Sequence, residues 1–223
     1  MSFKEVISQT DFPLLGRGVG VRLTLTNTGK RFNREWIFRH LDYSFVPGKT
    51  YAITGPNGSG KSTLLQVIAG SVLYNEGSIE YTGPVSGINF YQQVSIAAPY
   101  LELIEEMTAK EMLQFHAKFK SLTLPVAEIL EIVGLTNATD KQLRNFSSGM
   151  KQRLKLAQAF FSDAPVLLLD EPTTNLDADG IALYQQLIHN YTKEKLVIIS
   201  SNDKQEYEFC EEVIAIGKYK SVD

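Results

Sequence analysis

The chain has 223 residues, of which 43% are hydrophobic and 21% charged, and its formal net charge at neutral pH is −3. This length suits one compact α/β unit, and the small negative charge argues against a nucleic-acid-binding surface as the main function. No run of residues approaches the roughly 18 consecutive apolar positions of a membrane-spanning helix. The single cysteine, Cys210, fits a reducing cytoplasm. We therefore expect a cytoplasmic protein whose membrane role, if it has one, comes through a partner.

The first part of the chain, to about residue 85, reads mostly as strands. Val19–Thr26 mixes apolar and polar positions, and Leu41–Val46 is followed by a Pro-Gly turn. Tyr51–Thr54 is a short apolar run that leads directly into a glycine-rich loop. Ser62–Ala69 then has the pattern of a helix.

The middle of the chain changes to helical patterns. Thr108, followed three residues later by Glu111, forms a capping box ahead of a helix. Pro125–Val133 begins with proline and has apolar residues at helical spacing, and Gly149–Phe161 carries a third helical pattern. These patterns predict a helical insertion over roughly residues 100–160.

Alternating strands and helices resume after this insertion. Val166–Leu169 and Leu196–Ser200 are continuous apolar runs, which are typical of strands buried on both faces of a parallel sheet. Ala178–Tyr191 between them predicts a helix, and Val213–Ile216 predicts a last strand. The alternation predicts an α/β fold with a mostly parallel sheet.

The residues between the third predicted strand and its helix match the phosphate-binding pattern GxxxxGK[ST]. They are Gly55, Pro56, Asn57, Gly58, Ser59, Gly60, Lys61, Ser62 and Thr63. Glycines let backbone N–H groups turn toward phosphate oxygens, and the following helix adds its positive N-terminus. Lys61 would reach the β- and γ-phosphates, and the Ser62 hydroxyl would bind Mg²⁺. The sequence therefore predicts a site for ATP and Mg²⁺.

Two acidic residues, Asp170 and Glu171, follow the apolar run that begins at Val166. Ligands of α/β sheets bind at the carboxyl ends of the strands, so Asp170 is expected near the metal, which it would hold through the water shell. Glu171 would polarise the attacking water as a general base. Acidic residues also close strands without any function, and the phosphate loop decides in favour of the catalytic interpretation.

Four motifs in this order resemble the ABC-type ATPases. They are the phosphate loop, Phe146–Arg153, Leu169–Pro172 and Asn175–Asp177. The resemblance implies a RecA-like P-loop NTPase core, an N-terminal antiparallel β region and an inserted helical subdomain. We expect the core at residues 1–98 and 161–223 and the helical subdomain at residues 99–160.

The signature segment (residues 146–150, FSSGM) stands where this family has LSGGQ. In the family this segment caps the ATP that a second subunit holds, so Ser147, Ser148 and Gly149 are implied to bind nucleotide across a dimer. Ser-Ser-Gly before a helix is more often a plain N-cap. The order and spacing of the motifs carry the assignment.

Phe32 resembles the aromatic residue that stacks on adenine in this family. Trp36 and Phe38 are rival candidates. An aromatic residue at this place is also a core residue at least as often.

The sequence departs from the family pattern at two places. The family has a glutamine at the end of the strand before the helical subdomain, where the equivalent position here falls near Ala98, while Gln93 is a fallback that comes early. The family also has a switch histidine, and Asn202 stands at its place. Asparagine can hydrogen-bond a γ-phosphate but cannot carry a proton at neutral pH. Hydrolysis is therefore expected to be slow.

The resemblance implies an ATP-hydrolysing subunit that drives a transmembrane permease subunit from the inner face of the membrane, paired with a second ATPase subunit in a homo- or heterodimer. The single-domain form favours small exporters, including those similar to the haem-exporter ATPase. One alternative is an ATP-binding clamp with weak or no hydrolysis, and another is a soluble ABC ATPase outside transport. No nucleic-acid partner is expected.

Overall fold

The computed structural model describes residues 20–83 and 90–220. A three-stranded antiparallel sheet has the order β2-β1-β4, and a five-stranded parallel sheet has the order β5-β6-β7-β3-β8. The strands are β1 (Arg22–Phe32), β2 (Glu35–Phe45), β3 (Thr50–Thr54), β4 (Glu76–Thr82), β5 (Val94–Ala97), β6 (Val166–Asp170), β7 (Leu196–Ser200) and β8 (Glu212–Ala215). Residue 19, at which the first predicted strand begins, lies outside the described residues.

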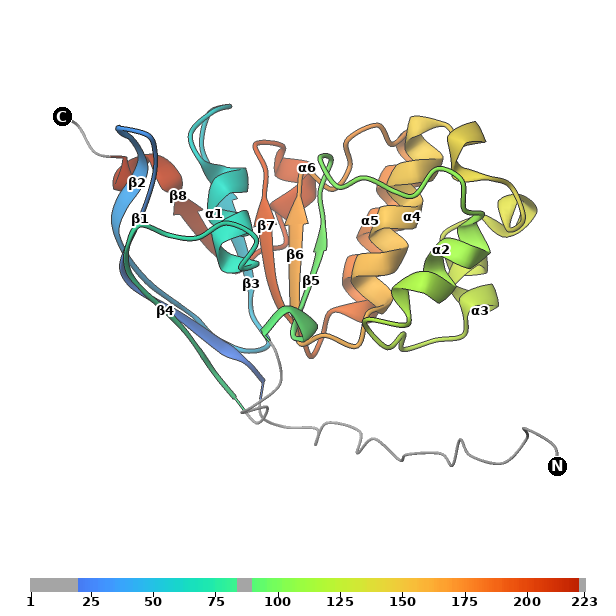
Figure 1. The fold of residues 1–223 in the computed structure, drawn as a ribbon, viewed down its shortest axis with the longest axis horizontal. Helices are drawn as coiled ribbons and strands as arrows, with labels where there is room; N and C mark the ends of the chain where they lie inside the picture. Colours follow the sequence, from blue (N-terminus) through green and yellow to red (C-terminus); the bar gives the residue numbers. More distant parts are fainter. Residues whose placement is uncertain (1–19, 84–89, 221–223) are drawn as a thin grey trace, which may run out of the picture.

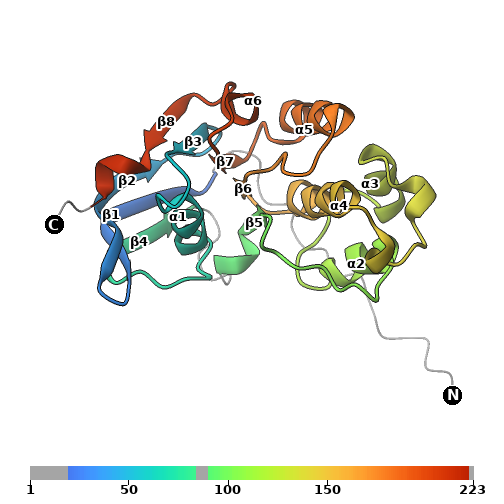
Figure 2. The same cartoon turned by 90° about the horizontal axis from the view of Figure 1, so that it is seen from above.

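The helices lie on both faces of the parallel sheet. They are α1 (Lys61–Ile68), α2 (Ala109–His116), α3 (Val126–Ile132), α4 (Ser148–Phe161), α5 (Ala178–Tyr191) and α6 (Lys204–Tyr207). Single 3₁₀ turns occur at Phe90–Gln92, Thr136–Ala138, Leu143–Asn145 and Ile216–Tyr219. Figures 1 and 2 show α4 and α5 on one side of the sheet, α1 and the antiparallel sheet on the other, and α2 and α3 outside α4. No helix in the two described ranges combines the length and apolar character needed to cross a membrane.

The two central strands, β6 and β7, are buried at every position. Because side chains alternate along a strand, Leu167 and Leu169 pack in the core on the α4 side, whereas Val166 and Leu168 pack in the core that contains α1 and the antiparallel sheet. A sheet with an apolar core on each face needs continuous apolar strands. This explains why the runs in these two strands could be recognised in the sequence.

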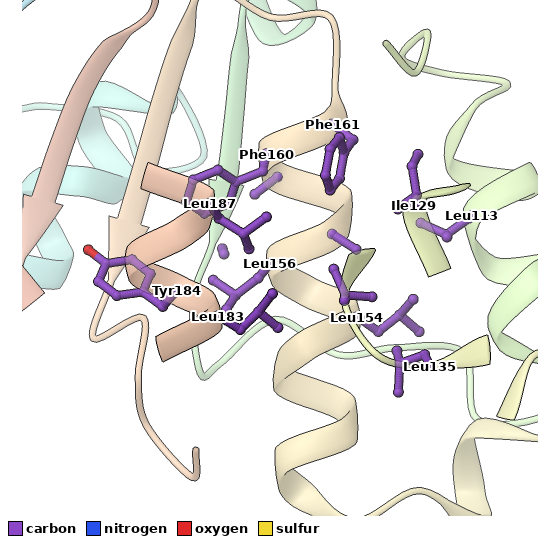
Figure 3. Packing of buried hydrophobic residues seen from close by; sticks show 14 of the residues in the cluster. Leu113, Ile129, Leu135, Leu154, Leu156, Phe160, Phe161, Leu183, Tyr184 and Leu187 are labelled. Carbon is purple, nitrogen blue, oxygen red and sulfur yellow. The ribbon is translucent and has the colours of Figure 1, made fainter. Parts of the chain in front are cut away.

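Helix α4 is the centre of the core on the helical side. Figure 3 shows Leu156 and Phe160 of α4 on the side of α5, where Leu183 and Leu187 lie, whereas Leu154 lies on the side of α2 and α3. All these side chains belong to one buried cluster that also contains residues of β6 and β7. Helix α4, which begins within the signature segment, is therefore packed against the sheet and against α5.

The structure confirms the predicted fold class, an α/β protein with a parallel sheet and an N-terminal antiparallel region. Helix α5 and strand β7 have the predicted bounds, and Thr108 makes the predicted capping box with Glu111. The subdomain boundary at residues 99–160 stays a prediction.

The antiparallel region was less visible in the sequence. β2 begins at Glu35, six residues before the predicted Leu41, and β4 was not predicted. The pairing of β1 with β2 shifts register at several points, and Asn27 and His40 have positive φ angles of 46° and 53°. Such bulges break the alternation of polar and apolar residues by which strands are recognised.

His116 of α2 gives a prediction for the pH dependence of stability. Its Nε2 lies 2.7 Å from Ser162 Oγ, and burial together with the charge of Lys120 lowers its pKa from 6.5 to about 4. The folded state thus disfavours the charged ring, so this contribution is complete above pH 6.5 and is lost as the pH falls toward 4. We expect a loss on the order of 2 kcal/mol, allowing for solvent screening.

Urea unfolding at pH 7 and pH 4.5 measures this loss. His116→Gln should make the free energy of unfolding less dependent on pH than in the wild type, while His189→Gln, at an exposed position, should leave the dependence unchanged. Equal pH dependence in all three proteins would refute the prediction.

Candidate functional site

The phosphate loop connects β3, which ends at Thr54, to α1, which begins at Lys61. Strand β3 lies between β7 and β8 and is parallel to both. The ends of β3, β6 and β7 therefore meet at one edge of the sheet, and the residues that follow them can share one site.

Two glycines give the loop its shape. Gly58 has φ 76° and open space where a Cβ would lie, whereas Gly60 has φ 99° and its Cβ would lie 2.4 Å from Ile37 Cγ2 of β2. Residues other than glycine rarely adopt such angles, and Gly60 also needs the close approach to β2. The loop can therefore turn backbone N–H groups inward only with these residues.

The Lys61 side chain is buried, with 5% of its surface exposed. Its ammonium donates hydrogen bonds to the carbonyls of Gly55 (2.7 Å) and Pro56 (3.3 Å). A buried cation held by two neutral carbonyls has no opposite charge in these contacts, so an incoming phosphate would be a stronger partner.

Asp170 is the last residue of β6 and lies opposite Ser200 of β7. The side chain of Asp170 is 1% exposed, and its Oδ1 has no hydrogen-bond partner among the described residues, nor has Ser200 Oγ or Ser59 Oγ. Buried polar atoms are nearly always paired, so these three fit a ligand with water or a cation. The described residues contain no group of three or more His, Cys, Asp or Glu side chains that could hold a metal. A cation here would thus take its remaining ligands from hydroxyl groups, phosphate and water.

Glu171 follows directly and has a positive φ of 44°. Its N–H donates to the carbonyl of Ser200 (2.9 Å), and its own carbonyl accepts from Thr174 (3.1 Å). The left-handed backbone takes Glu171 out of the line of the strand, next to Asp170 at the edge of the sheet.

Asn202 contacts the phosphate loop. Its Oδ1 accepts from the Gly55 N–H (3.2 Å), and its Nδ2 donates to Asn57 Oδ1 (3.1 Å). The structure therefore brings Asn202 together with the phosphate loop, and its hydrogen bond to a γ-phosphate stays a prediction. The contact of Asn202 with Asn57, itself a predicted residue of the phosphate loop, was not predicted, because it spans 145 positions of sequence.

The end of β5 carries the position at which the family glutamine was sought. Ala98 follows β5 and is fully buried, whereas Gln93 precedes the strand and its carbonyl accepts from Val166 at the opposite end of β6. Gln93 is therefore wrong as a fallback candidate. Two residues after Ala98, burial and the nearby charge of Asp170 raise the pKa of Tyr100 to about 12.

Residues 147–150 of the signature segment line a cavity. Ser147 caps α4, its Oγ accepting from the Met150 N–H at 3.2 Å, and Ser148 and Gly149 are the first residues of the helix. Their cavity, of about 530 Å³, is also lined by Asn175 and contains no residue of the phosphate loop. The structure thus does not bring the signature segment to the phosphate loop of the same chain.

A basic residue closes one side of this cavity. Arg153 of α4 lies 3.4 Å from Asp177 Oδ1, and the Gly180 N–H together with Arg153 lowers the pKa of Asp177. This ion pair connects the segment Asn175–Asp177 to α4.

The three candidate aromatics differ in their surroundings. Phe38 is fully buried in the core, so its role as a stacking residue is excluded. Phe32, at the end of β1, is 47% exposed and has the Lys30 ammonium 4.6 Å from its ring centroid. Trp36 lies beside the guanidinium groups of Arg31 and Arg39. Phe32 keeps an accessible ring, and its contact with adenine stays a prediction.

The comparison with known proteins agrees with this geometry. The ABC transporter family matches residues 38–174, more than half of the chain. The chain belongs to the ABC transporter family. The lantibiotic transport ATP-binding protein SrtF of Streptococcus pyogenes is 32% identical over 187 residues, covering 81% of this chain and 79% of the relative. The bacitracin transport ATP-binding protein BcrA of Bacillus licheniformis is 34% identical, covering 82% and 62%.

A solved structure supports the same fold. The putative ABC transporter ATP-binding protein of Pyrococcus furiosus superposes with a TM-score of 0.75 at 20% identity, covering 90% of this chain and all of that one. ABC family membership implies ATP binding and suggests ATP hydrolysis, and the subunits with which this chain shares its sequence are named for transport.

Proposed function

We propose that this chain binds and hydrolyses ATP and drives a transmembrane permease subunit. The observation that carries the proposal is the meeting of four groups at one sheet edge: the Lys61 ammonium, the buried Asp170 carboxylate, Glu171 and the Asn202 carboxamide. A cation, two acids and a hydrogen-bond donor around a glycine-rich loop suit phosphoryl transfer to water.

Different residues would bind the phosphates, the Mg²⁺ ion and the adenine. Backbone N–H groups of residues 57–63 and the N-terminus of α1 would hold the phosphates, and Lys61 would leave the two carbonyls for the β- and γ-phosphates. Ser62 and Asp170 would hold Mg²⁺, Asp170 through water, and the ion supplies charge that offsets the phosphate oxygens. Phe32 would stack on the adenine.

Glu171 would act as the general base. Its carboxylate would accept a proton from the water that attacks the γ-phosphorus, while the bond from this phosphorus to the β-γ bridging oxygen breaks and ADP leaves. Asn202 would donate a hydrogen bond from Nδ2 to the γ-phosphate in exchange for its bond to Asn57. The place of Glu171 directly after β6 and the contacts of Asn202 with the phosphate loop support these roles.

A second chain would complete the site. Ser147, Ser148 and Gly149 line a cavity apart from their own phosphate loop, so they are free to cap the ATP of a partner subunit through the N-terminus of α4. Two chains, alike or different, would then enclose two nucleotides and separate when the γ-phosphate is lost.

The partner and location follow from this role. A permease subunit would hold the chain at the cytoplasmic face of the membrane, and no nucleic acid is needed. Two relatives are named for lantibiotic transport and bacitracin transport, which supports a role in transport. The similarity to the haem-exporter ATPase stays a prediction.

Turnover would be slow, because the site has Asn202 in place of a switch histidine and Ala98 in place of a glutamine. An ATP-binding clamp with weak or no hydrolysis is the second candidate function, and these same two substitutions favour it.

Replacement of Glu171 tests the hydrolytic role. Glu171→Gln keeps the size of the side chain but removes the base, so we expect kcat to fall by about a hundredfold or more while ATP affinity stays within about twofold. Glu194→Gln, at an exposed glutamate, is the matched control. Phosphate release and nucleotide titration measure the two quantities. An undiminished rate in Glu171→Gln would clear Glu171 of the role, and equal inactivity of wild type and variant with intact binding would favour the clamp.

Replacement of Asn202 tests the reason for slow turnover. Asn202→His supplies an imidazole that can donate to the γ-phosphate and carry a proton, so we expect kcat to rise by roughly tenfold. Asn202→Ala, which removes both hydrogen bonds, is the comparison variant and should not rise. A rate that does not increase in Asn202→His would show that the missing imidazole does not limit turnover.

A further inference from the structure

The loop that begins at Glu171 is held in an unusual backbone conformation. Glu171 has φ 44° and Asn175 has φ 66°. A non-glycine residue in this region is strained and persists only where its surroundings hold it. The contacts that hold the loop therefore bear on where the Glu171 carboxylate lies.

One contact comes from α6. Glu206 is 3% exposed, and its Oε1 accepts hydrogen bonds from the Thr173 N–H (2.7 Å) and from the Thr173 hydroxyl. Burial of a carboxyl group is costly unless it is hydrogen-bonded. Both of these bonds go to one residue, two positions after Glu171.

A second contact comes from the opposite side. Gln152 of α4, also 3% exposed, donates from Nε2 to the Pro172 carbonyl at 2.7 Å. The peptide group between Pro172 and Thr173 is thus hydrogen-bonded to α4 through its carbonyl and to α6 through its N–H. This leaves the loop little freedom to relax the left-handed angle of Glu171.

The segment that carries Glu206 also carries Asn202. Asp203 caps α6 through a bond to the Gln205 N–H (3.0 Å), and the Tyr184 hydroxyl of α5 donates to the Glu206 carbonyl (2.7 Å). Asn202 contacts the phosphate loop, and Glu206, four residues later in the chain, contacts the loop that begins at Glu171. One short, fixed segment therefore joins the two sides of the site.

We infer that Glu206 is a positioning residue for hydrolysis, which acts through Glu171 by holding Thr173 and hence the left-handed backbone that aims the Glu171 carboxylate. The inference rests on the proposed function, in which Glu171 is the general base. Glu206 itself contacts Thr173 and in this role would touch neither the nucleotide nor the attacking water.

The inference is tested by steady-state ATP hydrolysis of the full chain, with ATP affinity and thermal unfolding measured in parallel. Glu206→Ala releases Thr173 and should lower kcat by about tenfold or more, because a small misplacement of a reacting group is costly, while KM changes less than about twofold. Glu206→Gln keeps one acceptor oxygen for Thr173 and should restore most of kcat. In the Glu171→Gln background, Glu206→Ala should cause no further loss.

A matched control separates positioning from stability. Tyr184→Phe removes the buried hydrogen bond to the carbonyl of the same residue but leaves the Glu206 side chain in place, so it should lower the melting temperature without lowering kcat. Thr173→Val, which removes the hydroxyl donor and keeps the shape, should lower kcat even if Glu206→Ala fails to fold.

The outcomes are distinguishable. Turnover that depends on Glu171 but stays unchanged in Glu206→Ala or, where that variant does not fold, in Thr173→Val would overturn the inference alone. An equal loss in the wild-type and Glu171→Gln backgrounds would do the same, because Glu206 would then act by another route. A wild type with no turnover, or with turnover independent of Glu171, would overturn the proposed function and the inference with it.

Discussion

The site depends on a lysine ammonium that is buried at the carboxyl edge of a parallel sheet. Lys61 donates hydrogen bonds to the carbonyls of Gly55 and Pro56, which occupy two of its three donors but do not balance its charge. The nearby Asp170 is buried with an oxygen that no described residue pairs. A phosphate bound with a metal ion would resolve both deficits at once, and this complementarity gives the arrangement its function.

The packing of the two central strands explains how these groups are kept in place. β6 and β7 are buried on both faces, so Asp170 and Ser200 end adjacent strands whose register is fixed by the two cores. Helix α4 packs on one of these cores and starts at the signature segment, and its Gln152 also reaches Pro172 beside Glu171. The loop of Glu171 and the surface proposed to face a second subunit are therefore parts of one packed unit.

Much of this could be predicted from the sequence because it rests on local patterns. Residues 55–63 are recognisable as a phosphate-binding loop from their residue types and spacing. Leu196–Ser200 is recognisable as a buried strand from an unbroken apolar run. The bulged pairing of β1 with β2 hid the first residues of β2. The bonds of Asn202 to Asn57 and of Glu206 to Thr173 join distant positions, and no local pattern contains them. The sequence could not exclude Phe38 as a stacking candidate, because its complete burial depends on the tertiary fold.

The central claim is that the Lys61 ammonium exchanges loop carbonyls for phosphate. Calorimetric titration of the chain with ATP and Mg²⁺ tests it most directly, with Lys61→Ala compared to Lys49→Ala, whose lysine is partly exposed in a surface ion pair with Glu212. We expect saturable binding to the wild type and to Lys49→Ala, and an affinity at least about tenfold weaker in Lys61→Ala. Absence of binding to the wild type, or equal affinity in all three proteins, would contradict the account.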